Sequence, residues 1–402
     1  MSEWKKCRIG DLVTLRQGFA INAKSKHYIS KEHTSLALLR IADMKSGAKE
    51  IFIKEDIPQN FIAKKEDIIY TRTGNVGLVF RNNYGVVHNN CFTVTPNEES
   101  VLARDYLFYL LQNKDFYDKA NSLARGAAQP DLPHTLFNSI EILYPTIQTQ
   151  HRIATILSRY DSLIENYQKQ IKLLEEAAQR LYKEWFVDLH FPGHENTKIV
   201  NGVPEGWEKK TLGELISYVR GKSYSSNEIS DEGCIMVNLK NIQAFGGYKR
   251  DAEKRFIGEY KPEQTLQKGD LVMGVTDMTQ ERRLVGHVAL IPDFNEPATF
   301  SMDLIKIIPH SIPIIYLYCA MRYGGISKQI SPLANGVNVL HLKPDTILGT
   351  MMVVPRKDLI ERFRPFVEEM VNKILKNQSQ IRLLTEARDR LLPKLMSGEL
   401  KV

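Results

Sequence analysis

Cysteine is scarce in this chain of 402 residues, and the four cysteines lie far apart. Cys7, Cys91, Cys234 and Cys319 form no Cys-x-x-Cys pair, which argues against a disulfide framework and a zinc site. Long apolar runs are lacking as well. The opening MSEWKKCRIGDLV has no signal-peptide stretch, and the strongest run, IIYLYCAM, is far too short to span a bilayer. These absences predict a cytoplasmic protein with reduced thiols.

A basic tail and the nucleotide-binding fingerprints are also missing. Basic residues exceed acidic ones by only 54 − 47 = 7, and no segment concentrates the excess, so composition indicates an anionic partner only weakly. Neither GxGxxG nor GxxxxGKS/T occurs, so no cofactor is predicted to be bound by this chain. The composition is that of a globular protein, and the length allows two or more independent cores.

Side chains that could serve metal-dependent catalysis form no convincing set. Asp188 and the Glu208-x-Lys210 step resemble a nuclease carboxylate set, but no strand is predicted between them. His190 and His194 are four residues apart, but a Pro-Gly step between them prevents the helix that would direct both at one metal. The sequence therefore predicts no metal site and no catalytic residues, and a polar linker is the simpler interpretation of this region.

What the sequence does contain is an internal repeat. QIKLLEEAAQRL at residues 170–181 and QIRLLTEARDRL at residues 380–391 agree at eight of twelve positions, with an offset of 210 residues. Four further pairs follow the same order in both halves: WKKCRIGDL and WEKKTLGEL, EDIIY and GDLVM, FTVTP and IKIIP, ILYP and MVVP. Units of about 200 residues are far longer than solenoid repeats of ~20–50 residues, so we expect two similar domains.

The pattern within each half predicts an α+β domain followed by a long helix. Short apolar runs bounded by Gly, Asn and Pro predict strands, and helical periodicity appears at residues 103–123 and near 315–327. The sheets are expected to be small and mixed or antiparallel. The predicted division is a first domain at residues 1–147, a first long helix at 148–186, a linker at 187–206, a second domain at 207–355, and a second long helix with the C-terminal tail at 356–402.

Apolar residues in the two long helices recur at alternating steps of three and four. An apolar stripe this narrow is typical of a helix that packs against another helix. The alternative is that each helix belongs only to the core of its own domain, but such helices are seldom ~35 residues long. We expect the two related helices to pair as an antiparallel coiled coil with pseudo-twofold symmetry, forming a rod of roughly 50 Å. The predicted pairing residues are Leu157, Tyr160, Ile164, Tyr167, Ile171, Leu174, Leu181, Phe363, Val367, Met370, Ile374, Ile381, Leu384 and Leu391, with polar residues at positions 377 and 388 of the second helix.

The doubled order of these motifs resembles the specificity subunit of Type I restriction–modification systems, in which helical spacers separate two target-recognition domains. The similarity rests on an acidic-hydrophobic segment followed by Val-Gly in each half, on PEGW before the second half, and on a Gly-containing loop followed by a strand that ends in Pro. It covers essentially the whole chain. The second half departs from the first where Ile360 replaces Gln150 and Phe363 replaces Ile153, so its helix is expected to begin with different packing.

The resemblance implies a non-catalytic subunit that binds double-stranded DNA. Such a subunit recognises a split, asymmetric site and docks two modification subunits, which methylate adenine, and restriction subunits, which hydrolyse ATP and cut DNA. S-adenosylmethionine, ATP and Mg are then expected in the partner subunits, and the chain itself has no Asn-Pro-Pro-aromatic methyltransferase segment. Two alternatives stay open: a stand-alone DNA-modifying or DNA-cleaving enzyme, and a coiled-coil scaffold without DNA contact.

Candidate DNA-binding residues in the first half come from an acid-free stretch. Residues 68–97 contain no Asp or Glu but include two arginines, one histidine and six asparagines. Arginine can bridge O6 and N7 of guanine, and asparagine can bridge N6 and N7 of adenine. The alternative is a solvated hairpin with Asn turns. The predicted residues are Arg72, Thr73, Asn75, Arg81, Asn89 and Asn90, with Arg125 and Gln129 on the glycine loop RGAAQPD.

In the second half, DMTQERRL replaces the turn TGNV, and the interval from Asp270 to Gly286 is six residues longer than the interval from Asp67 to Gly77. Asp277 and Glu281 in this loop could accept a hydrogen bond from cytosine N4, or could pair with Arg282. The glycine loops of the two halves align at Gly126 and Gly336, and these glycines indicate turns rather than an approach to phosphate. The predicted DNA-binding residues of the second half are Thr276, Gln280, Arg282, Arg283, Asn338 and His341.

Overall fold

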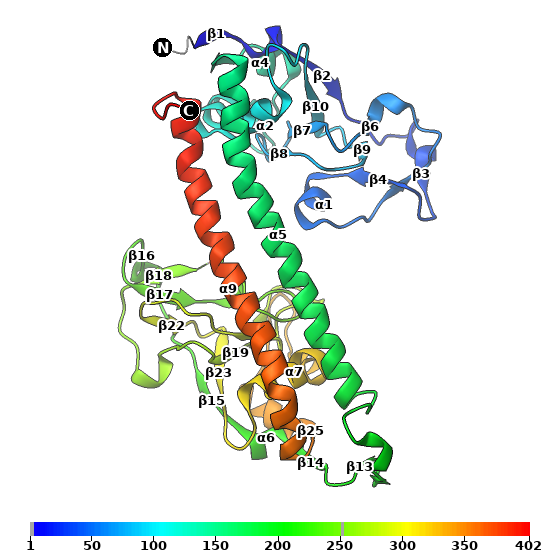
Figure 1. Cartoon of the computed structure of the whole chain (residues 1–402), viewed down its shortest axis with the longest axis vertical. Coiled ribbons are helices and arrows are strands. Elements are labelled where there is room, and N and C mark those ends of the chain that lie inside the picture. The colour runs from blue at the N-terminus through cyan, green and yellow to red at the C-terminus, as the bar shows by residue number, and fades with distance from the viewer. Residues whose placement is uncertain (1–3, 251–252) are drawn as a thin grey trace. The chain divides into compact units, whose positions relative to one another are not determined.

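The computed structural model describes residues 4–250 and 253–402, which divide into two units. The first unit contains residues 1–163 and 384–402, and the second contains residues 164–383. Each unit combines small β-sheets with helices, and two long helices each contribute to both units (Figure 1). The predicted α+β class is therefore confirmed.

The first unit contains two sheets and one separate strand pair. A four-stranded antiparallel sheet has the order β2-β10-β7-β8, a five-stranded sheet has the order β3-β5-β4-β9-β6, and β1 pairs with β11. Short helices complete the unit (Figure 1). The elements are β1 (Lys5–Arg8), β2 (Val13–Gln17), β3 (Ile29–Ser30), β4 (Leu36–Leu39), α1 (Ile41–Ser46), β5 (Phe52–Ile53), β6 (Ile62–Ala63), β7 (Ile68–Thr71), β8 (Val79–Phe80), β9 (Gly85–Val87), β10 (Cys91–Pro96), α2 (Arg104–Gln112), α3 (Lys114–Leu123), α4 (His134–Asn138) and β11 (Glu141–Tyr144).

The second unit contains two four-stranded sheets and three strand pairs. The sheets have the orders β15-β23-β19-β21 and β16-β18-β17-β22, and the pairs are β14 with β25, β20 with β24, and β12 with β13. The elements are β12 (Ile199–Val200), β13 (Val203–Pro204), β14 (Glu208–Thr211), α6 (Leu212–Leu215), β15 (Ile216–Arg220), β16 (Ile229–Ser230), β17 (Cys234–Val237), β18 (Lys254–Phe256), β19 (Leu271–Gly274), β20 (Thr276–Asp277), β21 (Val288–Leu290), β22 (Ala298–Phe300), β23 (Leu304–Pro309), α7 (Ile314–Tyr323), α8 (Ile326–Ile330), β24 (Leu340–His341) and β25 (Met351–Val354).

The strand order shows that the sequence repeat is a structural repeat. The sheet β2-β10-β7-β8 has the same succession as β15-β23-β19-β21, and each unit has one parallel pair, β4 with β9 or β17 with β22. In both units the first strand of the repeat pairs with the strand that leads into a long helix. The motif pairs quoted from the sequence therefore lie on equivalent strands.

Gly18 follows β2 and Gly221 follows β15, and the structure explains why both halves have a glycine at this position. A β-carbon on Gly18 would lie 2.2 Å from the carbonyl oxygen of His88, and one on Gly221 would lie 2.0 Å from that of Ser301. Both positions therefore require a residue without a side chain, because a neighbouring backbone segment lies against them. This close approach joins the two sheets of each unit at the same place.

The helix predicted over residues 103–123 is two helices. α2 ends at Gln112 and α3 begins at Lys114, because Asn113 has extended backbone angles of φ −62° and ψ 137° and separates them. Asn113 is buried. The prediction of one helix was wrong because both pieces carry apolar residues in helical spacing, and the apolar pattern continues across the break.

The segment predicted to be a polar linker is packed. Phe191 is buried in a small cluster with Trp207 and Leu359, and β12 and β13 form a short hairpin within residues 187–206. The absence of apolar periodicity did not indicate this packing, because one aromatic side chain in an irregular loop creates no period. The remaining boundaries of the predicted division stay predictions.

The two long helices are α5 (Ile147–Phe186) and α9 (Lys357–Met396), each of 40 residues (Figure 1). In the second unit they run antiparallel, since Gln170 contacts Asn377 while Tyr182 contacts Phe363. In the first unit Asp161 of α5 bonds to Arg388 of α9. The pairing of the two helices in opposite directions, expected from the sequence, is thus present in the second unit.

The predicted seam residues of both helices are all buried or half-buried. Leu157, Phe363 and Val367 are completely buried, whereas leucines beside the seam are exposed, with Leu173 at 64% and Leu383 at 49%. The alternating spacing of apolar residues, three and then four positions apart, therefore identified the buried face of each helix. The contribution of each seam residue to pairing stays a prediction.

The two polar positions of the second seam make contacts across the helix pair. Asn377 is 1% exposed, and its side-chain nitrogen donates to Oε1 of Gln170 at 3.1 Å. Arg388 donates to Asp161 at 2.8 Å. A buried polar pair in a seam can fix the register of two helices at a cost in stability.

Replacing Asn377 with leucine is expected to raise the free energy of unfolding by about 1–2 kcal/mol, because Oδ1 of Asn377 is buried without a partner. Gln170 is only half-buried and can be hydrated instead. Urea unfolding of the full chain measures the change. The control is Asn372→Leu at an exposed position of α9, which should stay within ~0.5 kcal/mol of the parent. Destabilisation by Asn377→Leu would show that the hydrogen bond outweighs the buried oxygen.

The predicted difference at the start of the two long helices is present and has a physical cause. Gln150 is completely buried; its Oε1 accepts from the N–H of Ala103 at 2.8 Å, and its Nε2 donates to Val101 O at 2.9 Å. Ala103 is the N-cap of α2, and the N-cap of the equivalent helix α7 is Pro313. Because a proline nitrogen has no hydrogen, the second unit has no donor to satisfy there, and Ile360 can replace the glutamine.

Candidate nucleic-acid interface

Three segments of the first unit meet at the end of β7. The N–H groups of Arg72 and Thr73 donate to the carbonyl oxygen of Asn90, at 2.8 and 3.2 Å, in the turn before β10. Gly74 N donates to Pro130 O at 2.8 Å in the glycine loop. The structure therefore brings together the β7 end, the Asn89-Asn90 turn and the glycine loop, which the sequence had proposed as separate DNA-binding stretches.

The guanidinium of Arg72 is held by two side chains at this junction. Its Nε and Nη2 donate to the two carboxylate oxygens of Asp131, at 3.0 and 2.6 Å, and its Nη1 donates to Oε1 of Gln17 at 3.1 Å. The Thr73 hydroxyl donates to the same carboxylate at 2.6 Å. The hydrogen bonds from Arg72 and Thr73 lower the pKa of Asp131, against a smaller opposing effect of burial.

The other predicted residues of the first unit are arranged around this junction, with one exception. Asn75, Arg125 and Gln129 are exposed, and the backbone of Arg125 pairs with that of Asp131 on the closed glycine loop. Gly126 has φ +98°, so the loop glycine serves a turn, as the sequence indicated.

Arg81 is the exception. Its Nη2 donates to Asp161 of α5 at 3.2 Å, and its guanidinium lies 4.0 Å from the ring centroid of Phe108. These contacts use the side chain for packing the first unit against its long helix. They favour a structural role over the DNA contact predicted from the sequence.

The second unit assembles equivalent segments in the same way. Thr276 on β20 lies opposite His341 on β24, and Nε2 of Gln280 donates to Val337 O at 2.8 Å in the second glycine loop. Asn338 and His341 are exposed, whereas Thr276 is buried and donates to Asp303. The six predicted residues of the second half thus lie on two adjoining segments, and Thr276 is the buried one among them.

The acidic residues of the longer loop, Asp277 and Glu281, both have partners other than Arg282. Asp277 is 1% exposed and accepts from the N–H groups of Thr279, Leu284 and Val285, so it holds the loop closed and is not available to a base. Glu281 pairs with Arg283 rather than with Arg282. Arg282 adopts a left-handed conformation with φ +52°. The sequence could not distinguish the two arginines, because the loop conformation decides which one faces Glu281.

The loop around Asp277 is expected to lose its structure only in acid. Burial by itself would raise the pKa of Asp277, but the N–H donors of Leu284, Thr279 and Val285 outweigh it, and the pKa lies below its ordinary 3.8. A depressed pKa stabilises the fold above the ordinary value and is lost as the pH falls through the depressed one. Hydrogen exchange of the Leu284 and Val285 amides should therefore stay protected down to about pH 4. Loss of protection near neutral pH would contradict this assignment.

Three side chains that bind the candidate DNA-contact residues of the two units were not predicted from the sequence. Gln17 and Asp303 lie outside the segments chosen for their basic or amide residues, and Asp131 lies at the end of the chosen glycine loop. Asp131 was passed over although its loop was recognised, because the loop was chosen for Arg125 and Gln129. Its role is visible only when its partner Arg72 is known, and the two are 59 residues apart.

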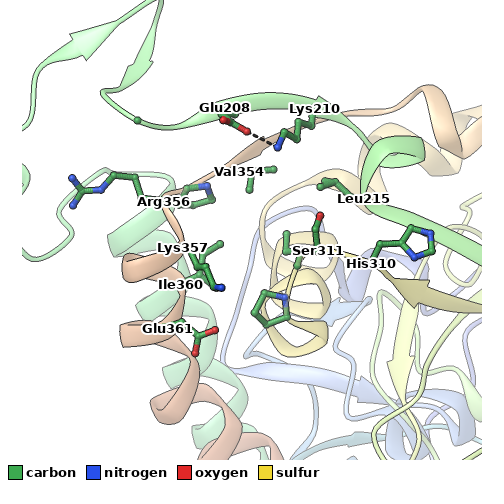
Figure 2. Close-up of a pocket in the computed structure, with 14 residues that line it drawn as sticks. Glu208, Lys210, Leu215, His310, Ser311, Val354, Arg356, Lys357, Ile360 and Glu361 are labelled. Atoms are coloured by element: carbon green, nitrogen blue, oxygen red, sulfur yellow. Dashed lines mark ion pairs between the residues drawn. The ribbon is translucent and has the colours of Figure 1, made fainter.

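A depression near the start of α9 is lined by none of the DNA-contact candidates (Figure 2). It has a volume of about 560 Å³, and the Glu208–Lys210 ion pair, at 2.5 Å, lies on its wall. His310 and Ser311 are adjacent in sequence, but the His310 ring points away from the Ser311 hydroxyl in Figure 2. The side chains therefore form no nucleophile–base pair in this depression.

Among the residues considered for metal chemistry, the rings of His190 and His194 are neighbours with centroids 5.5 Å apart, whereas the two carboxylates are engaged separately. Asp188 binds Lys183 at 2.5 Å, whereas Glu208 binds Lys210, so each carboxylate has its own lysine. Within residues 4–250 and 253–402 no group of three or more His, Cys, Asp or Glu side chains is arranged to hold a metal ion. No helix in the same part of the chain is long and apolar enough to cross a membrane.

Comparison with known proteins gives a consistent result over the whole chain. Residues 1–176 match the Type I restriction modification DNA specificity domain. The chain is 26% identical over 422 residues to the Type I restriction enzyme MjaIX specificity subunit of Methanocaldococcus jannaschii, covering all of this chain and 94% of the relative. It is 23% identical over 481 residues to the HindI specificity subunit of Haemophilus influenzae, with both chains covered completely.

A solved structure shares the fold. The S subunit of a Type I restriction–modification system from M. genitalium superposes with a TM-score of 0.62 at 18% identity, over 98% of this chain and 96% of that one. The fold of this chain is thus similar to that of a Type I restriction–modification S subunit. Residues 1–176 are a Type I restriction modification DNA specificity domain, and the resemblance expected from the sequence is confirmed.

Proposed function

We propose that this chain is the non-catalytic DNA-recognition subunit of a Type I restriction–modification complex, and that its two domains recognise the two halves of a split, asymmetric site. The observation that carries the proposal is the repetition of one framework with different side chains. Thr73 and Thr276 occupy equivalent positions, but the residue before each is Arg72 in one unit and Val275 in the other. The residues facing the two threonines are Asp131 and His341. Different side chains on one framework suit two different base sequences.

The exposed and half-exposed residues of the two clusters are the proposed DNA contacts. In the first unit they are Arg72, Thr73, Asn75, Asn89, Asn90, Arg125 and Gln129, and in the second Gln280, Arg282, Arg283, Asn338 and His341. We do not include Arg81, Thr276 or Asp277, because their side chains are engaged within the protein.

The long helices are proposed to set the distance between the half-sites. A helix of 40 residues rises about 60 Å, and B-DNA advances roughly 34–36 Å per turn. The spacing would then depend on helix length and not on the recognised bases. Polar substitution of Leu174 or Leu384 should loosen this selectivity, which can be measured by binding to duplexes whose central gap varies by one base pair.

The proposed partners are double-stranded DNA, two modification subunits and the restriction subunits of the same system, with complex formation in the cytoplasm. Methyl transfer, ATP hydrolysis and DNA cleavage would take place in those subunits, which would bind S-adenosylmethionine, ATP and Mg. The whole-length similarity to proteins named specificity subunits supports this division of labour.

The proposal is tested by selecting bound duplexes from a random library with the full chain in complex with its modification subunit. We expect a motif with two fixed blocks and an unspecified gap. The Arg283→Ala variant should lose about 1–3 kcal/mol of discrimination at one base pair of one block and leave the other block intact. Selection of no motif, with binding that depends only on salt, would refute the proposed function.

A further inference from the structure

We infer that Arg72 recognises a guanine in one half-site, and that Asp131 and Gln17 are positioning residues that hold its guanidinium for this contact. The inference rests on the proposed DNA-recognition function. It adds the identity of one base and two residues that were absent from the sequence-predicted set.

The hydrogen bonds of Arg72 leave the donors that such a contact requires. A guanidinium has five N–H groups. One on Nε and one on Nη2 are used by Asp131, and one on Nη1 is used by Gln17. One N–H therefore stays available on each terminal nitrogen. Bidentate recognition of guanine needs one donor for O6 and a second donor for N7.

The two positioning residues are themselves fixed to the framework. Asp131 accepts from the Thr73 hydroxyl at 2.6 Å, and the Gln17 side-chain nitrogen donates to Asn89 O at 2.7 Å. The Arg72 side chain is 21% exposed, so it reaches the surface without being free to move through many rotamers. Holding a side chain in its bound orientation lowers the entropy lost on binding.

The charge arrangement favours a base edge over a phosphate. Asp131 is 35% exposed and lies beside the guanidinium, so its negative charge offsets that of Arg72 and opposes a nearby phosphate. The hydrogen-bond donors are unaffected by this compensation. A neutral pair of acceptors such as guanine O6 and N7 is therefore the better partner.

The second unit has no equivalent of this arrangement. Val275 precedes the threonine of β20 where Arg72 precedes Thr73, and Arg220 ends β15 where Gln17 ends β2. The guanine contact is thus expected in only one block of the recognised motif.

The DNA side of the inference can be tested with the unmodified protein. In the full chain with its modification subunit, the selected motif is resynthesised with 7-deazaguanine, which lacks the N7 acceptor, at each guanine in turn. We expect one substitution to lower affinity about tenfold. The Arg72→Ala complex should bind the parent site roughly 10- to 100-fold more weakly and should not respond to that substitution.

Variants of the positioning residues provide the second arm. Asp131→Asn and Gln17→Ala should reduce the preference for guanine at the same base pair. Arg72→Lys should lose this preference as Arg72→Ala does, because an ammonium lacks the planar fork of a guanidinium. The matched control is Glu99→Gln, which alters an exposed carboxylate that accepts from Nε and Nη2 of Arg104 in the same unit. It should leave the motif unchanged.

The possible outcomes separate this inference from the proposed function. A motif without a guanine sensitive to 7-deazaguanine overturns the inference and leaves the function intact. The inference is also overturned if Arg72→Ala weakens all sequences equally and lowers the salt slope by about one, since that is the behaviour of a phosphate contact. Absence of any motif for the unmodified complex refutes the function itself.

Discussion

Replacing Phe363 with alanine is expected to lower the free energy of unfolding by about 3–5 kcal/mol. Phe363 is completely buried on α9, and its ring contacts those of Tyr182, Trp185, Phe186 and Tyr316 at centroid distances from 4.8 to 6.3 Å. Its removal takes apolar contacts from both long helices and from α7 at once, and leaves a cavity that large rings cannot fill. Urea unfolding of the full chain, followed by tryptophan fluorescence, measures the loss.

The matched control lies three residues further along the same helix. Phe366 is 56% exposed, so Phe366→Ala removes the same side chain from a position with little apolar contact and should change stability by less than about 1 kcal/mol. Equal effects of the two substitutions would show that the aromatic cluster around Phe363 does not hold α5, α7 and α9 together.

Replacing Asp161 with alanine is expected to cost about 3–5 kcal/mol, because it leaves two arginines without their shared partner. The Asp161 side chain is 14% exposed and accepts from Arg81 at 3.2 Å, Arg388 at 2.8 Å and the Tyr109 hydroxyl at 2.5 Å. This one carboxylate joins α2, the β8 end and both long helices in the first unit. Chemical unfolding of the full chain would measure the cost.

Asp105 provides the comparison for Asp161. It lies 3.8 Å from the same Arg81, but its side chain is 76% exposed, so Asp105→Ala should change stability by less than about 1 kcal/mol. If Asp161→Ala were equally mild, the carboxylate would behave as a solvated surface group, and Arg81 would be available for the DNA contact predicted from the sequence.

Much of the fold could be predicted from the sequence because its signals are local or repeated. The two long helices, which begin at Ile147 and Lys357, were recognisable because a seam of threes and fours over many turns is distinctive. Short elements were predicted less well. The break at Asn113 and the packing of Phe191 depend on neighbours distant in the chain, and neither has a periodic pattern.

The candidate site was predicted only in part for a related reason. The stretches that carry Arg72, Asn90 and the first glycine loop were proposed separately from the sequence, and the structure brings them together at the end of β7. Which side chains are free was not predictable. Arg81 binds Asp161 and Asp277 binds backbone N–H groups, and both choices follow from contacts that the sequence does not display.

The sequence by itself determined that the chain contains one α+β design twice, each copy followed by a long helix with one covered face. These properties are present in the order and spacing of residues, which a repeat displays twice. Only the tertiary structure decided that Gln17, Arg72 and Asp131 form one cluster while Arg81 is withdrawn from it. Hydrogen-bond partners are selected by which strand ends and loops come together, and that selection is a property of the folded chain.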